Sequence, residues 1–105
     1  MSWGVYYSAE ALRDLQDIYE YIAFDLSEPE TAEKLLNKLR SMIRSLDEMP
    51  KRYPIYDSEP WRSKEIRKFN AGHYLVFYVT QEEQHSVMIV RIIYGGRDLT
   101  KQETE

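Results

Sequence analysis

Two apolar stripes joined by a short break constrain the fold of this chain more than any other feature of its sequence. In the first, apolar side chains recur every three or four residues, as on one face of an amphipathic helix: Leu12, Leu15, Ile18, Tyr19, Ile22 and Leu26. A second stripe has the same spacing: Ala32, Leu35, Leu36, Leu39, Met42, Ile43 and Leu46. Pro29 lies between them and is tolerated only in the first turn of a helix, so it marks a new helix start. The short connection predicts an antiparallel helical hairpin.

The rest of the chain favours strands. Residues 3–7, "WGVYY", read as an opening strand because β-branched and aromatic residues dominate them. The polar segment 62–69, "RSKEIRKF", is interpreted as an edge strand. Residues 74–80 and 86–94 are apolar on both alternating faces, which is typical of central strands. We therefore predict three strands in the C-terminal half.

Between these strands lie segments with loop and turn chemistry. Residues 50–61 carry three prolines and no sustained period, so they are expected to form a loop. The segments "NAGH" (70–73) and "QEEQH" (81–85) predict the two hairpin turns. The resulting order is β-α-α-β-β-β, an α+β fold with an antiparallel sheet packed against an N-terminal helical hairpin. We interpret residues 1–105 as a single domain, with its core in 3–101 and a short polar C-terminal tail.

Composition excludes several kinds of chemistry. The sequence has no cysteine, which rules out disulfides and thiolate catalysis, and its two histidines make no convincing metal site. No metal or cofactor is expected. The N-terminus lacks the pattern of a signal peptide, and no apolar run approaches the roughly 20 residues of a membrane helix. We therefore expect a cytoplasmic protein with no membrane contact.

The net charge of −4 argues against a global nucleic-acid-binding surface. The charge is uneven, however: residues 51–100 hold eight Lys and Arg against six Asp and Glu. A local basic patch in the strand region remains open. The acidic residues on the predicted helices, including Asp14, Asp17, Glu20 and Glu33, are interpreted as solvated.

Four segments, in this order and spacing, resemble the RelE/ParE superfamily of toxins from bacterial type II toxin–antitoxin pairs: "SAEALRDLQDIYEYI", "MPKRYP", "RKFNAGHYLVFY" and "IIYGGRDL". The resemblance covers residues 3–101. It implies one of two activities. RelE-like members cut mRNA in the ribosomal A site, whereas ParE-like members inhibit DNA gyrase. For both kinds it implies a cognate antitoxin as partner.

The resemblance also implies site residues for RNA cleavage, which needs a proton acceptor, a proton donor and cations. Arg97 and Lys68 match basic residues of RelE-like enzymes, and His73 is a candidate substitute base. Other expected groups are missing: Leu75 replaces an arginine, Ile66 replaces a lysine, and the tail "TKQETE" lacks the expected tyrosine near Glu103.

For a toxin that acts by binding, the candidate contact residues are basic or aromatic: Arg97, Lys64, Arg67, Tyr53 and Tyr56. The two tyrosines lie in the proline-rich loop and are expected to be better exposed than the strand tyrosines. Arg91 interrupts an apolar strand, and we expect it to form a structural ion pair. His85 is interpreted as a solvated turn residue.

The depleted RNase positions favour a ParE-like toxin that acts on gyrase by binding rather than by chemistry. One alternative is a ribosome-dependent, metal-independent endoribonuclease that uses Arg97, Lys68 and His73. Another is an attenuated module that binds the antitoxin without toxicity.

Overall fold

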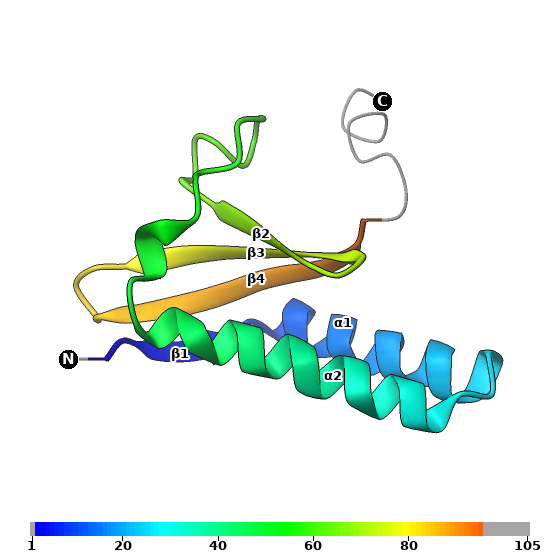
Figure 1. The fold of residues 1–105 in the computed structure, drawn as a ribbon. Helices are drawn as coiled ribbons and strands as arrows, with labels where there is room; N and C mark the ends of the chain where they lie inside the picture. Colours follow the sequence, from blue (N-terminus) through cyan, green and yellow to red (C-terminus); the bar gives the residue numbers. More distant parts are fainter. Residues whose placement is uncertain (1, 96–105) are drawn as a thin grey trace.

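The computed structural model describes residues 2–95 of the chain. The predicted order of elements is confirmed, and the elements are β1 (Gly4–Tyr7), α1 (Ala9–Glu20), a π-helical turn (Tyr21–Asp25), α2 (Pro29–Arg44), two 3₁₀ turns (Ser45–Asp47 and Pro50–Arg52), β2 (Arg67–Ala71), β3 (Tyr74–Gln81) and β4 (Ser86–Tyr94). The two helices form an antiparallel pair that covers one face of the sheet (Figure 1). The fold is therefore α+β, as expected.

The sheet is mixed, with strand order β1-β4-β3-β2. β2, β3 and β4 form an antiparallel meander, but β1 pairs in parallel with β4, from Gly4 opposite Ser86 to Tyr7 opposite Ile89. The prediction of a wholly antiparallel sheet was wrong at β1. α1 continues in the direction of β1, and α2 runs back antiparallel to α1 (Figure 1). β2 and β4 therefore run in the same direction as β1, and β3 runs in the opposite direction.

The predicted strand over 62–69 was also wrong in its first half. Residues 59–65 form turns instead, in which the Ile66 amide donates to the Trp61 carbonyl at 3.1 Å and the Ser63 amide donates to the Glu59 carboxylate at 3.2 Å. These local bonds compete with strand pairing. The strand then continues through Asn70 and Ala71, so only Gly72 and His73 form the turn. Gly72 has φ +63°, which glycine adopts without strain.

Ser8 fixes the start of α1. Its hydroxyl oxygen accepts a hydrogen bond from the Ala11 amide at 3.0 Å and donates to the Val90 carbonyl at 2.9 Å, so one side chain caps the helix and ties it to β4. Two members of the first predicted stripe are nevertheless exposed: Leu12 at 54 % and Leu26 at 50 %. Leu26 follows the π-helical turn, which shifts the helical period, and Leu12 borders a hollow described below.

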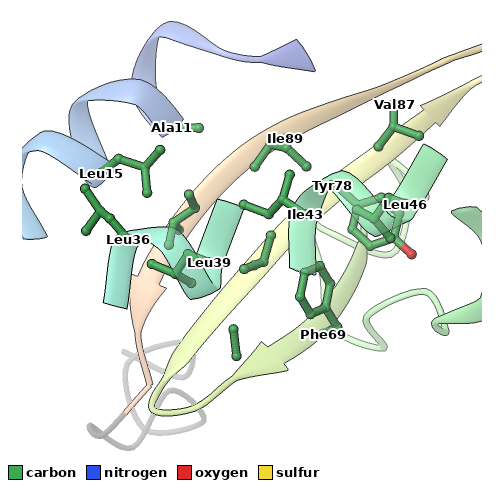
Figure 2. Packing of buried hydrophobic residues seen from close by; sticks show 13 residues of the cluster. Ala11, Leu15, Leu36, Leu39, Ile43, Leu46, Phe69, Tyr78, Val87 and Ile89 are labelled. Atoms are coloured by element: carbon green, nitrogen blue, oxygen red, sulfur yellow. The ribbon is translucent and has the colours of Figure 1, made fainter. Parts of the chain in front are cut away.

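The main core lies between the helices and the sheet (Figure 2). It holds thirteen buried residues: Ala11, Leu15, Leu36, Leu39, Ile43, Leu46, Phe69, Ala71, Val76, Tyr78, Val87, Ile89 and Ile92. The Tyr78 ring is fully buried, and its hydroxyl donates to the Pro50 carbonyl at 2.6 Å. Burial raises the pKa of Tyr78 to about 12, against the opposing charges of Arg67 and Arg52.

Candidate functional site

The loop before β2 covers the face of the sheet opposite the helices. Trp61 stacks on Phe77 with ring centroids 4.5 Å apart, and Tyr56 meets the same ring edge-on at 5.5 Å. Tyr53 stacks on Phe69 at 4.9 Å. Tyr53 and Tyr56 are therefore partly buried packing residues, and the prediction of well-exposed loop tyrosines was wrong. Tyr56 packs on a small second core, centred on Phe77, that the sequence pattern did not reveal, whereas Tyr53 packs against the main core through Phe69.

The basic residues of β2 hold this loop in place. The Arg67 guanidinium donates to the carbonyl oxygens of Lys51 at 3.2 Å and Tyr53 at 2.6 Å. The Lys68 ammonium lies 5.5 Å from the centroid of the Tyr56 ring, within cation–π range. Lys64 lies exposed in the turn before the strand. Arg67 and Lys68 thus make intramolecular contacts, whereas Lys64 faces solvent.

The candidate RNase residues are not brought together within residues 2–95. Lys68 contacts Tyr56, whereas His73 lies exposed in the turn beyond the end of β2. From Lys68 to Ala71 the strand rises about 10 Å, and His73 follows in the turn. The centroids of the His73 and Tyr94 rings lie 6.5 Å apart. Arg97 lies outside the described residues.

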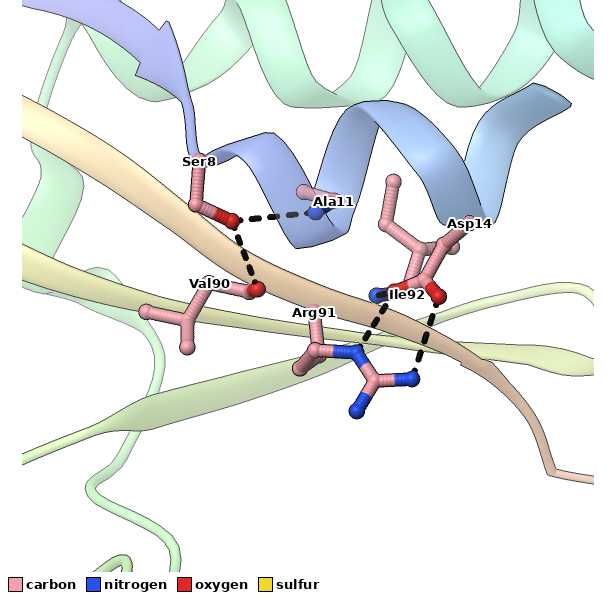
Figure 3. Close-up of polar contacts among 6 residues, drawn as sticks. All are labelled: Ser8, Ala11, Asp14, Val90, Arg91 and Ile92. Atoms are coloured by element: carbon pink, nitrogen blue, oxygen red, sulfur yellow. Dashed lines mark hydrogen bonds and ion pairs between the residues drawn. The ribbon is translucent and has the colours of Figure 1, made fainter.

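The predicted ion pair of Arg91 is confirmed, and its partner is Asp14 on α1 (Figure 3). The two guanidinium nitrogens Nε and Nη2 donate to the Asp14 carboxylate at 2.8 and 3.0 Å, and these bonds raise the pKa of Arg91. The Ile92 amide also donates to Asp14, at 2.9 Å. The interpretation of Asp14 as solvated was wrong. β4 extends beyond the end of the shorter strand β1, so the backbone groups on that edge of β4 need other hydrogen-bond partners, and Asp14 supplies one.

His85 lies exposed in the turn between β3 and β4, as predicted, and it also has a ring contact. Its ring stacks on Trp3 with centroids 4.2 Å apart, and its backbone has φ +52°. Among the described residues there is no group of three His, Cys, Asp or Glu side chains that could hold a metal ion. In residues 2–95, no helix has the length and apolar character needed to cross a membrane.

Two adjoining hollows run along the outer side of the helical hairpin, and we call them together the helix groove. The first, of about 320 Å³, lies between α1 and α2 and is lined by Leu12, Leu15, Gln16, Tyr19, Glu33, Leu36, Asn37 and Arg40. The second, of about 240 Å³, extends toward β1 and is lined by Val5, Tyr7, Leu12, Leu15, Arg40, Ile43 and Arg44. Leu12 belongs to both hollows. The sequence analysis missed this groove, although Leu12, Arg40 and Arg44 all stand on the predicted helices.

The β1 end of the helix groove is cationic. Arg40 and Arg44 are exposed, one helical turn apart on α2, and neither makes an ion pair with any residue in 2–95. Both guanidiniums act on the Tyr7 hydroxyl: burial raises the pKa of Tyr7, and the two positive charges oppose that rise. An apolar hollow bordered by two unpaired arginines can bind a segment that carries both apolar and acidic side chains.

Comparison with known proteins agrees with this fold. The family described as ParE toxin of the type II toxin–antitoxin system parDE matches residues 5–99. No individually curated protein matches the sequence.

Solved structures of toxins share the architecture. A chain of the chromosomal ParDE system from P. aeruginosa superposes with a TM-score of 0.71 at 19 % identity, covering 89 % of this chain and 96 % of that chain. A chain of the toxin–antitoxin complex RelBE2 from Mycobacterium tuberculosis gives 0.67 at 18 %, covering 90 % and 92 %. A variant of the E. coli toxin RelE in its free state gives 0.62 at 11 %, covering 98 % and 94 %. Since the family match spans nearly the whole chain and the fold agrees with it, the protein belongs to the ParE toxin family of type II toxin–antitoxin systems.

Proposed function

We propose that this ParE-family toxin arrests bacterial growth by binding DNA gyrase in the cytoplasm, and that a cognate antitoxin neutralises it. The observation that carries binding over RNA cleavage is the engagement of the strand cations. Arg67 holds two loop carbonyls, Lys68 covers Tyr56, and Arg91 is paired with Asp14. Cations that already have intramolecular partners are poorly placed to stabilise a developing phosphorane.

Proton transfer is equally unsupported by the described residues. RNA cleavage through the 2′-OH needs an acid and a base on either side of the scissile phosphate. Lys68 lies within β2 and contacts Tyr56, whereas His73 lies in the turn after Ala71, so a strand segment of about 10 Å separates their backbones. This separation supports inhibition by contact.

The test is a pair of assays on the purified toxin. We expect inhibition of gyrase supercoiling and intact mRNA in a purified translation system. Arg97→Ala lowers gyrase inhibition if Arg97 contacts the target. Position-specific mRNA cleavage that Arg97→Ala abolishes would instead establish the endoribonuclease. Unimpaired growth on expression without the antitoxin would contradict toxicity itself.

For the antitoxin, we place one part of the contact in the helix groove. Leu12 is exposed there, and Arg40 and Arg44 have no acidic partner in residues 2–95, so an antitoxin segment with apolar and acidic side chains complements the surface. The structural neighbours include toxins from ParDE and RelBE2 systems, which supports a protein partner of this kind.

Charge reversal tests this placement. Arg40→Glu with Arg44→Glu should lower antitoxin affinity about 100-fold, because two complementary charge pairs become repulsive. Toxicity without the antitoxin should persist. Arg13→Glu is the matched control, since Arg13 is an exposed arginine on α1 outside the groove. Unchanged neutralisation of the double variant would exclude the groove as an antitoxin contact.

A further inference from the structure

Three tyrosines from three separate elements lie toward the end of the molecule where β4 ends. Tyr21 opens the π-helical turn after α1, Tyr74 begins β3, and Tyr94 ends β4. Tyr74 and Tyr94 are register partners, and their rings meet edge-on at 5.4 Å. Asp14 binds the Arg91 guanidinium and the Ile92 amide, and Tyr21 follows Asp14 by seven residues, so this face of the helix lies along the last residues of β4. Burial raises the pKa of Tyr74, and Tyr94 and Tyr21 raise it further.

This cluster, which we call the tyrosine surface, is open to solvent. Tyr21 is 54 % exposed and Tyr94 is 50 % exposed, whereas Tyr74, whose ring meets Tyr94 edge-on, is half-buried. His73 borders the surface at 6.5 Å from Tyr94 and is also exposed. Half-exposed tyrosines held by packing lose little conformational entropy on binding, and tyrosine is enriched at protein interfaces for that reason.

The tyrosine surface lies in an acidic part of the chain. Residues 14–30 contain six Asp and Glu and no Lys or Arg. Asp14 and Asp17 precede Tyr21 by seven and four residues, which places all three on one face of the helix. Asp14 forms an ion pair with Arg91, whereas Asp17 is exposed and has no ion pair within residues 2–95. A free carboxylate therefore lies one turn from an exposed aromatic ring.

The helix groove and the tyrosine surface differ in charge. The helix groove has Arg40 and Arg44 at its β1 end, whereas the tyrosine surface has Asp17 and Glu20 beside it. A segment that complements one surface is repelled by the other. The groove and the tyrosine surface thus suit partners of opposite charge.

We propose that the tyrosine surface binds an arginine-bearing segment of the toxin's protein target. This inference rests on the proposed function, in which the target is a protein that the toxin inhibits by contact. A guanidinium stacks on the faces of Tyr21 and Tyr94 by cation–π attraction. Its fork of N–H donors pairs with the Asp17 carboxylate, which favours arginine over lysine. The target contact then lies apart from the antitoxin contact proposed in the helix groove.

The first test compares tyrosine variants of the full chain in gyrase inhibition. Tyr21→Ala with Tyr94→Ala should lower potency about ten-fold, as expected for the loss of two exposed cation–π contacts. Tyr21→Phe with Tyr94→Phe should keep most of the potency, because the rings remain. Asp17→Lys should lower potency by repulsion. Tyr6→Ala is the matched control, since Tyr6 is 57 % exposed on β1 and lies opposite Met88, six residues before Tyr94 along β4.

The outcomes separate the two proposals. If the wild type inhibits gyrase and the double alanine variant does so equally, the tyrosine surface is overturned while the proposed function stands. If the wild type does not inhibit gyrase, the proposed function fails, and a direct titration decides about the surface. In that titration a short glycine–arginine peptide should shift the NMR ring signals of Tyr21 and Tyr94, and a glycine–glutamate peptide should not. Absence of those shifts would overturn the inference.

Discussion

The two faces of the sheet are buried by different means. On the helix-covered face, thirteen residues from both helices, the 3₁₀ turn after α2 and three strands form one core. On the loop-covered face, the buried cluster within residues 2–95 consists of Ile66, Leu75 and Phe77, beneath the partly buried rings of Tyr56 and Trp61. The first face depends on repeated apolar positions along regular elements. The second depends on a few aromatic contacts around Phe77.

This difference predicts how the free energy of folding is divided between the two faces. Buried apolar area is the main source of folding free energy, so the helix-covered face should carry most of it. The loop-covered face has fewer buried contacts and should open at a lower free energy than global unfolding. The following substitutions test that division.

The largest effect is expected on the helix-covered face. Leu39→Ala should lower the free energy of unfolding by about 3–4 kcal/mol, because Leu39 is fully buried and its removal leaves a cavity. Urea denaturation followed by circular dichroism measures the change. Lys38→Ala, an exposed neighbour on α2, should stay within about 0.5 kcal/mol. A smaller loss for Leu39→Ala than for Trp61→Ala would reverse the comparison.

The second-largest loss of stability is expected at alkaline pH, where Tyr78 on the helix-covered face loses its proton. Tyr78 loses its proton near pH 10 in the unfolded chain and at about 12 in the folded protein. The protonated form therefore stabilises the fold fully below pH 10, and about 2–3 kcal/mol is lost as the pH rises from 10 to 12. Unfolding measured between pH 9 and about 12 should show this slope.

Tyr78→Phe provides the control for that slope. It should cost about 1–2 kcal/mol at neutral pH, because the Pro50 carbonyl loses its buried hydrogen bond. Between pH 10 and about 12 its slope should be shallower than that of the wild type, with a remainder from Tyr7 and Tyr74, whose pKa values are also raised. An identical slope in wild type and variant would show that Tyr78 is not the titrating group.

The third-largest loss of stability is expected from breaking the ion pair between Asp14 on α1 and Arg91 on β4. Phe77 and Arg91 are register partners, so the Arg91 ion pair joins the side of the sheet that carries Phe77 to α1. Asp14→Ala should cost about 2 kcal/mol, because it removes this pair and leaves the Ile92 amide without its acceptor. Thermal unfolding measures it, with the exposed Asp17→Ala as control. A double variant with Arg91→Met that is no less stable than Asp14→Ala alone would confirm the coupling.

The smallest effect is expected on the loop-covered face. Trp61→Ala should lower the free energy of unfolding by about 1–2 kcal/mol, since Trp61 is only partly buried. Amide hydrogen exchange should accelerate over 55–66 and stay unchanged in α1 and α2. Acceleration throughout the protein would show that both faces unfold as one unit.

The candidate sites were predictable to different degrees. The ion pair of Arg91 follows from one charged residue in an apolar strand, because burial of an unpaired guanidinium is too costly. Its partner Asp14 was not predictable, since the need for an acceptor arises only from β4 outrunning β1. Tyr53 and Tyr56 resemble exposed loop residues in sequence and pack only because Phe69 and Phe77 lie beneath them. Lys68 and His73, close in sequence, were separated because strand residues rise by about 3.3 Å each.

The sequence by itself determined the order of elements, the helical hairpin and the central strands, because the helical and strand periods of apolar residues persist over many positions. Tertiary structure alone decided the parallel pairing of β1, the start of β2 at Arg67, the helix groove and the contact of Tyr74 with Tyr94. The physical reason is range. A period is a local property of the chain, whereas an edge that needs hydrogen bonds or a face that needs cover exists only after distant segments have packed.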